Sequence, residues 1–322
     1  MKCTFRNLIL VTLLGASMQT VAQSWPTKPV KLVVSQAAGG APDIVARLVS
    51  DRLSRMWGQQ VLVDNRPGAG NVIGAQFAAR SAPDGYTLFF ATAAALVTNP
   101  YTFKTLPYDP ARDFVPVGMV GKAPFFVLVH PGVQAKTLSE LIALEKSQPG
   151  KLTYATDGPR NFSGMVAAWV NKLGGMNILQ VPYATMPQGI QDTVAGRTQV
   201  VILAIPVAAP QLKQGALRAL AFTSATRAPG YENVPLVAET FPGFDFVGWF
   251  AFVAPTGTPQ DVIRRINRDM DSVLKDPEVV QRLRGMGIFT DGADTPEGTG
   301  AFIRAELATW GKVVKEIGLQ PE

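Results

Sequence analysis

Residues 29–53 read PVKLVVSQAAGGAPDIVARLVSDRL and combine three local signals in one short stretch. Val30–Val34 is an apolar run typical of a buried strand, Gly39-Gly40 breaks the chain, and apolar residues from Ile44 to Leu53 recur at helical spacing. A strand, a glycine turn and a helix start leave backbone N–H groups pointing outward at the positive end of the helix dipole. The stretch therefore predicts a site for a carboxylate or phosphate that needs no charged side chain.

Similar units follow along most of the chain. The expected strands are Val30–Val34, Gln60–Val63, Thr87–Phe90, Phe125–Val129, Leu152–Ala155, Ile178–Val181, Val200–Ile205 and Leu217–Phe222. The expected helices are Pro42–Trp57, Ile73–Ser81, Leu138–Ser147, Ser163–Leu173, Gln188–Ala195, Pro259–Lys275 and Pro296–Ile317. This alternation predicts an α/β architecture with mainly parallel sheets.

Two apolar runs suggest how the chain is divided. Phe125–Val129 and Phe246–Ala254 flank the middle section, as expected of a chain that crosses into a second domain and returns. We expect a first domain formed by residues 23–122 and 225–322, with a second domain at residues 123–224. The C-terminal helices would then pack on the first domain.

The first 22 residues have the pattern of a cleavable export signal. Lys2 and Arg6 precede the apolar stretch Leu8–Leu14, and small residues follow at Thr20–Ala22. Cys3 is the only cysteine, so its removal with the signal rules out a disulfide-stapled scaffold and leaves stability to a large core. No later apolar run approaches the roughly 20 residues of a membrane span, which predicts a soluble exported protein.

A second stretch repeats the arrangement of the first. Residues 152–165, LTYATDGPRNFSGM, again read as a strand, a polar glycine turn and a helix start, and Asn161 or Ser163 can cap that helix. If the two turns belong to different domains, two helix N-termini could face one cleft and each hold a carboxylate of one ligand. Two ordinary strand-to-helix turns remain an equally good interpretation. Arg160 is either a bidentate carboxylate clamp or, more often for a loop arginine, a solvated side chain.

Other classes of function have little support. His130 is the only histidine, so the usual His/Cys metal sites are excluded, and no serine lies in a nucleophile-elbow sequence. The glycines at 68, 70 and 74 have the wrong spacing for a dinucleotide fingerprint. The formal charge of +6 comes from scattered lysines and arginines, which argues against nucleic-acid binding. The sequence therefore predicts a binding protein, without a cofactor or metal, rather than an enzyme.

Several short segments together are similar to one known family. They are Trp25–Pro29, Gly39-Gly40 with Asp43 and Ala46-Arg47, Asp64–Gly70, Ala82–Leu88, Leu106–Pro110, Val181–Tyr183, Leu217–Ala221 and Ala254–Pro259. In this order, behind an export signal, they resemble the Bug-type extracytoplasmic solute receptors of tripartite tricarboxylate transporters. The resemblance covers nearly all of the mature chain.

The resemblance implies a periplasmic binding-protein fold in which two α/β domains, each with a mixed sheet flanked by helices, close on a small carboxylate. It also implies a monomer that works with a large and a small inner-membrane transporter subunit. The ligand-binding residues implied in this chain are Ser35, Gln36, Ala38, Gly39, Gly40, Asp43, Thr92, Ala93, Thr156, Asp157, Gly158, Arg160, Asn161, Tyr183, Leu203 and Ala204.

Departures from the family pattern bear on the ligand. Polar family positions are replaced near Leu203, Ala204 and the alanine stretch 91–95, whereas Arg160 adds a charge. We expect a monocarboxylate or an aromatic carboxylate, with Arg160 at its charged end, because a tricarboxylate would leave charges unpaired at a cost of several kcal/mol. Asp157 would repel an anion and is alternatively a partner of Arg160, which would then be structural.

Two other functions remain open at this point. A sensory subunit that passes ligand-induced closure to a membrane two-component system would have the same sequence features as a transport receptor. An enzyme built on the same fold is disfavoured by the single histidine and by the absence of cysteine after residue 3.

Overall fold

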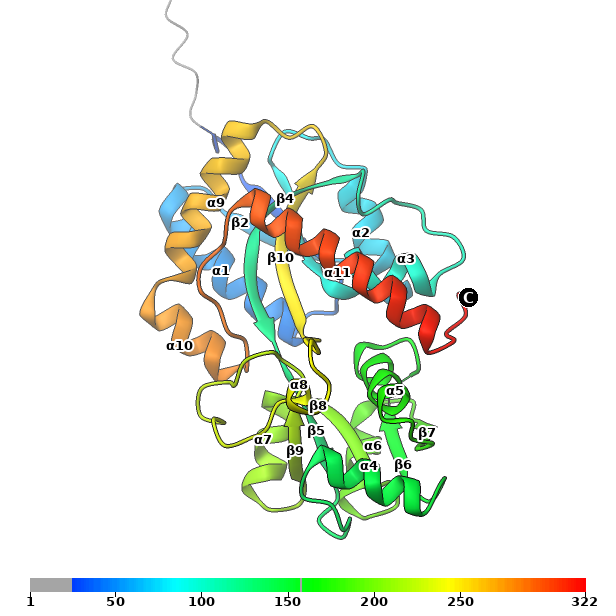
Figure 1. Ribbon diagram of the computed structural model, residues 1–322. Coiled ribbons are helices and arrows are strands. Elements are labelled where there is room, and N and C mark those ends of the chain that lie inside the picture. The colour runs from blue at the N-terminus through cyan, green and yellow to red at the C-terminus, as the bar shows by residue number, and fades with distance from the viewer. Residues whose placement is uncertain (1–24, 157) are drawn as a thin grey trace, which may run out of the picture.

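The computed structural model describes residues 25–156 and 158–322. The export signal expected in residues 1–22, and Asp157, lie outside the described residues. The chain forms two mixed five-stranded sheets, each flanked by helices and connected by extended chain segments (Figure 1). This confirms the α/β class with mixed sheets. The expectation of mainly parallel sheets was wrong, because β10 (Gly248–Pro255) and β5 (Phe125–Val129) each pair antiparallel with both of their neighbours.

The first sheet has the strand order β2-β1-β3-β10-β4. Strand β1 (Val30–Val34) pairs in parallel with β2 (Val61–Asn65) and β3 (Thr87–Thr92), and β10 (Gly248–Pro255) lies antiparallel between β3 and β4 (Phe114–Ala123). We call this sheet and its helices the first lobe. The helices are α1 (Ala41–Trp57), α2 (Val72–Ala79), α3 (Asn99–Thr102), α9 (Gln260–Leu274), α10 (Pro277–Gly285) and α11 (Pro296–Glu316), with short helical segments η1 (Ala69–Asn71) and η2 (Ala94–Thr98).

The second sheet, with the order β7-β6-β8-β5-β9, and its helices form the second lobe. Strands β6 (Thr153–Thr156), β7 (Leu179–Pro182) and β8 (Val200–Ala204) are parallel to one another, whereas β5 (Phe125–Val129) is antiparallel to β8 and β9 (Arg218–Phe222). The helices are α4 (Leu138–Ser147), α5 (Phe162–Gly174), α6 (Met186–Val194), α7 (Ile205–Lys213) and α8 (Val237–Thr240).

Apolar periodicity explains why these elements pack. In α1, Val45, Leu48, Val49 and Leu53 are buried against the first sheet, together with Ile263, Ile266 and Met270 of α9. Trp310 of α11 is fully buried and contacts Phe162 and Phe246 of the second lobe, so the two lobes share an aromatic contact. In the part of the chain that the structure describes, no helix is long and apolar enough to cross a bilayer.

Residues 223–246 lie beside the second sheet before the chain returns to the first lobe at β10. Phe222 forms a bridge with Leu236, and the backbone N–H of Phe246 donates to Thr223 O, which hold residues 223–246 against the second sheet. Strand β4 was not predicted, because Pro116 and two glycines interrupt its apolar pattern. It is an edge strand, where proline is tolerated.

Candidate functional site

The carboxyl ends of the parallel strands face each other across the lobe crossing. Both β3 and β4 are antiparallel to β10, so β4 runs in the direction of β1 and β3 and leads directly through Pro124 into β5. At the start of β5, Phe125 lies opposite Ala204, the last residue of β8. The carboxyl edges of both sheets therefore point toward the crossing, which is where open α/β sheets bind ligands.

The predicted site residues follow these two edges. On the first lobe, Ser35, Gln36, Ala38, Gly39, Gly40 and Asp43 come after β1, and Thr92 and Ala93 come at the end of β3. On the second lobe, Thr156, Gly158, Arg160 and Asn161 come at the end of β6, Tyr183 after β7, and Leu203 and Ala204 at the end of β8. Their role as ligand contacts stays a prediction.

The first turn is held by an asparagine that sequence reasoning had not selected. Asn71 Oδ1 accepts hydrogen bonds from Ser35 Oγ (3.1 Å) and Gln36 Nε2 (2.6 Å). Gly74 of α2 packs directly on this turn, since a methyl group there would lie 2.8 Å from Ser35 Cα. The glycine-rich segment 68–74, whose spacing excluded a dinucleotide fingerprint, thus supports the first turn.

The buried carboxylate of Asp43 stabilises the first turn through hydrogen bonds. Its carboxylate accepts from Gly39 N (2.9 Å), Asn65 Nδ2 (2.9 Å) and Arg47 Nε (3.0 Å), and the residue is only 2% exposed. Burial by itself raises the pKa of Asp43, but the hydrogen bonds from Arg47, Gly39 and Asn65 outweigh it and lower the pKa. Asp43 therefore stabilises the turn in its ionised form, and its carboxylate accepts the hydrogen bond from Gly39 N.

The start of α1 remains close to the surface. Gly40 is the extended N-cap residue without a side-chain cap bond, and Pro42 lies in the first helical turn. Ala38 and Gly39 are exposed, and Gly40 is half-buried. The backbone around this helix start is therefore accessible to an anionic group.

The second turn is similarly compact. Thr156 is buried, and its Oγ1 donates to Gly158 O (3.0 Å) and accepts from Gly158 N (3.2 Å). Asn161, one of the two capping candidates, is the extended N-cap residue of α5. Gly164, in the first turn of α5, faces Thr156 and Gly158 so closely that no larger side chain fits without a shift.

Arg160 has protein partners. Its Nη2 donates to Gln320 O (2.9 Å), and its Nη1 lies 3.1 Å from Glu322 Oε2. In this arrangement the guanidinium binds the segment after α11 and is not available to bind the carboxylate of a ligand. The alternative pairing with Asp157 falls on a residue outside the described ones.

The remaining predicted residues differ in burial and in their partners. Thr92 and Ala93 are buried, and Leu203 lies in the apolar core of the second lobe. Tyr183 donates its hydroxyl to Asp192 Oδ2 (2.8 Å). Ala204 is half-exposed at the N-cap of α7, so its backbone is more accessible than the Leu203 side chain.

Three exposed apolar residues begin helices at the same edges, and sequence reasoning missed them as site candidates. Ile44 in the first turn of α1 is 47% exposed, Ile73 at the start of α2 is 49% exposed, and Val207 at the start of α7 is 44% exposed. Ile44 was expected on the apolar face of its helix, and no sequence signal singled out Ile73 or Val207. Exposed aliphatic side chains at these edges are suited to the apolar part of a ligand or to the opposite lobe.

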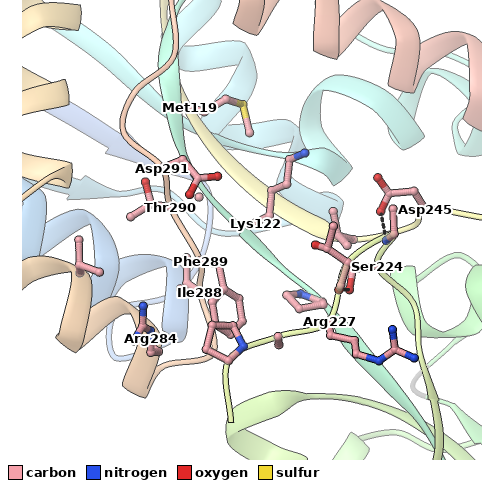
Figure 2. A pocket seen from close by; sticks show the side chains of 18 of the residues that line it. Met119, Lys122, Ser224, Arg227, Asp245, Arg284, Ile288, Phe289, Thr290 and Asp291 are labelled. Atoms are coloured by element: carbon pink, nitrogen blue, oxygen red, sulfur yellow. Dashed lines mark hydrogen bonds between the residues drawn. The ribbon is translucent and has the colours of Figure 1, made fainter. Parts of the chain in front are cut away.

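A cavity of about 680 Å³ lies elsewhere at the lobe crossing (Figure 2). Figure 2 shows Arg284 and Asp291 on one side and Ser224, Arg227 and Asp245 on the other. None of the predicted site residues that the structure describes lines it. Its lining residues Lys122, Arg227 and Arg284 are balanced by Asp245, Asp291 and Asp294, which gives no net charge for an anion. We therefore place the candidate site at the facing carboxyl edges.

The described residues contain no group of three or more His, Cys, Asp or Glu side chains placed to hold a metal ion.

Known proteins similar to this chain agree on one family. The family described as "Tripartite tricarboxylate transporter family receptor" matches residues 45–319. A UPF0065 protein of Bordetella bronchiseptica is 34% identical over 98% of this chain and 94% of that protein. Protein BugT of Bordetella pertussis is 32% identical over 96% of this chain and 95% of its own length.

Solved structures extend this similarity to both lobes. Rpa4515 of R. palustris, solved with adipate, has a TM-score of 0.79 and 32% identity, covering 92% of this chain and 100% of that one. MatC from Rhodopseudomonas palustris, solved with bound malate, has a TM-score of 0.74 and 28% identity, covering 90% of this chain and 100% of that one.

Proposed function

Because this chain belongs to the tripartite tricarboxylate transporter receptor family, we propose that it captures a small organic carboxylate in the periplasm for the membrane subunits of such a transporter. One observation carries the proposal. The carboxyl edges of both sheets face the lobe crossing, and each edge leads through a tight turn into a helix N-terminus. Two helix N-termini on opposite lobes supply partial positive charge to one enclosed anion.

The charge balance at the turns favours a ligand with at most two carboxylates. Arg47, Arg66 and Arg160 are each paired with a carboxylate of the protein. Helix termini then neutralise the ligand, each with about half an elementary charge. One ligand carboxylate can be stabilised at each helix terminus, whereas a third carboxylate would have no positive charge beside it.

The exposed aliphatic residues favour an apolar body between those ends. Ile44, Ile73 and Val207 begin helices at the two edges, and each methylene of a ligand buried against such side chains contributes about 0.8 kcal/mol. An extended dicarboxylate with several methylenes meets both conditions. A monocarboxylate or aromatic acid, as expected from the sequence, also has an apolar body. That expectation, however, placed Arg160 at the charged end of the ligand, and Arg160 is paired with Glu322.

Calorimetry on the mature protein from Gln23 onward tests this proposal. The panel comprises adipate, malate, benzoate and citrate, which differ in charge and in the apolar part. We expect adipate to bind more tightly than malate and citrate not to bind. Binding of benzoate without adipate would favour the monocarboxylate class, and no binding of any acid would contradict the receptor proposal.

A matched pair of variants tests the apolar contact. Ile44 and Met56 belong to the same helix and are both 47% exposed, but Met56 lies at the opposite end from the turn. We expect Ile44→Ser to weaken adipate binding by about three- to tenfold, the range for partial loss of one aliphatic contact. Met56→Ser is expected to bind adipate like the wild type. Equal affinity in both variants would place the apolar part of the ligand away from α1.

A further inference from the structure

The segment after α11, residues 317–322, is fixed to the first lobe; we call it the tail. Glu322 N donates to Thr102 O (3.1 Å), and Lys104 N donates to Glu322 O (2.9 Å). Leu319 N also donates back to Val314 O of α11 (3.1 Å). These bonds make the tail a continuation of the first lobe, beside the chain that leaves the edge of β3 through η2 and α3.

The second turn reaches across to this tail through Arg160. Nη2 donates to Gln320 O at 2.9 Å, and Nη1 lies 3.1 Å from Glu322 Oε2. The side chain is 30% exposed, so the contact is partly shielded from solvent. A backbone carbonyl and a carboxylate of one lobe are therefore held by the two terminal nitrogens of one guanidinium from the other lobe.

A second contact from the same turn supports the first. Phe162, the first residue of α5, meets the ring of Trp310 edge-on, with a centroid distance of 5.6 Å. Figure 1 shows the start of α5 beside the end of α11. Arg160 and Phe162 thus dock the N-terminus of α5 on α11 and its tail through one ionic and one aromatic contact.

We propose that Arg160 and the tail form a clasp between the lobes, in which Arg160 and Glu322 are positioning residues for the ligand site. The clasp holds the N-terminus of α5 at a fixed distance from the first lobe. The contact between Arg160 and the tail exists only while the lobes are close together. It therefore stabilises the closed arrangement, in which both helix N-termini can contact one ligand. A larger population of the binding-competent state lowers the apparent Kd by the same factor.

The clasp itself is tested without ligand. Cysteines introduced at exposed Gln60 in the first lobe and Gln188 in the second carry spin labels, and the mature chain has no other cysteine. We expect Arg160→Ala and Glu322→Gln to lengthen or broaden the distance distribution between the labels. The combined exchange Arg160→Glu with Glu322→Arg should restore it in part, because it re-forms the ion pair but not the hydrogen bond to Gln320 O. Unchanged distributions in both single variants would overturn the clasp.

The effect on the ligand site, which rests on the proposed function, is measured with adipate. Arg160→Ala and Glu322→Gln are expected to raise its Kd by about two- to fivefold, the range given by a partly exposed ion pair. Glu316→Gln removes an exposed carboxylate at the end of α11, just before the tail, and is expected to change neither Kd nor label distance.

Weaker binding in Arg160→Ala alone, with Glu322→Gln unchanged in both measurements, would identify Arg160 as a direct ligand contact and overturn the clasp. If the wild type itself fails to bind adipate, the proposed ligand is wrong. The distances between the spin labels, measured without ligand, still test whether the clasp exists.

Discussion

Gly164 faces the carbonyl oxygen of Gly158 so closely that a methyl group added to it would lie 2.1 Å from that oxygen. The same methyl would lie 2.8 Å from Thr156 Oγ1, the atom that closes the second turn. The start of α5 and the preceding turn therefore fit together only with glycine at this position. Alanine is normally about 1 kcal/mol better than glycine inside a helix, so here local propensity and tertiary packing oppose each other.

Gly164→Ala is expected to lower the free energy of unfolding by about 1–3 kcal/mol, because the added methyl forces the second turn apart. Urea denaturation measures this change, and adipate calorimetry should show weaker binding. Gly285→Ala is the control, since a methyl group at Gly285 meets no atom within 4 Å. A Gly164→Ala protein as stable as the control would show that the turn relaxes without cost.

Asp43→Asn is expected to destabilise the protein at neutral pH by about 1–3 kcal/mol. The amide loses the charge-assisted bond to Arg47 and presents a donor where Gly39 N and Asn65 Nδ2 also donate. The pKa of Asp43 is lowered in the folded state, because hydrogen bonds from Arg47, Gly39 and Asn65 outweigh the raising effect of burial. Its contribution is therefore complete above the unfolded pKa, 3.8, and is lost as the pH falls through the folded pKa.

Urea denaturation of the wild type and Asp43→Asn at a series of pH values tests the predicted direction of this pH dependence. The difference in unfolding free energy should shrink below about pH 4, where the unfolded-state carboxyl begins to protonate. A difference that stays constant down to the acid unfolding limit would mean that the charge of Asp43 does not matter.

The sequence located the turns of the candidate site but not their supports. Val30–Val34 and Phe125–Val129 were predicted with their observed bounds, because continuous apolar runs flanked by turn residues specify buried strands locally. Asn71 supports Ser35 from 36 residues away, and Arg160 meets Gln320 across 160 residues. Such pairs depend on how the elements come together in three dimensions, which no local pattern in one sequence records.

A different physical reason explains the strand that was missed. Pro116 and the small residues of β4 weaken its strand pattern, yet β4 pairs with β10 along most of its length. Because β4 is at the sheet edge, the missing N–H of Pro116 costs little. Here the neighbouring strand β10 stabilises a segment whose own sequence points to a loop.

Trp57→Phe is expected to lower the free energy of unfolding by about 1–3 kcal/mol, because it leaves a buried acceptor without its donor. Trp57 Nε1 donates to Asp269 Oδ2 at 2.8 Å and joins α1 to α9 across 212 residues. Both residues are at most 9% exposed. Urea denaturation of Trp57→Phe, Asp269→Asn and the double variant measures the coupling. Strictly additive effects would show that the hydrogen bond itself contributes nothing.

Glu306→Gln is expected to stabilise the protein relative to the wild type as the pH rises. Glu306 lies on α11, and one of its carboxylate oxygens accepts from Trp249 Nε1 at 3.2 Å. Burial raises the pKa of Glu306, and the negative charge of Asp245 adds to this, whereas Trp249 and Lys122 act in the opposite direction. The folded state therefore binds this proton more tightly than the unfolded state does.

The sign of the pH dependence follows from that raised pKa. Wild-type stability should fall as the pH rises from the unfolded pKa of 4.5 through the folded value, because the folded protein must release the proton at a cost. Glutamine keeps an acceptor for Trp249 but has no proton to lose, so the variant should lack this decrease and match the wild type only at acidic pH. Urea denaturation between pH 4 and pH 8 measures both profiles, with the exposed Glu316→Gln as control. Parallel profiles for Glu306→Gln and wild type would mean that the folded protein solvates the Glu306 charge as well as water does, despite its position beside Trp249.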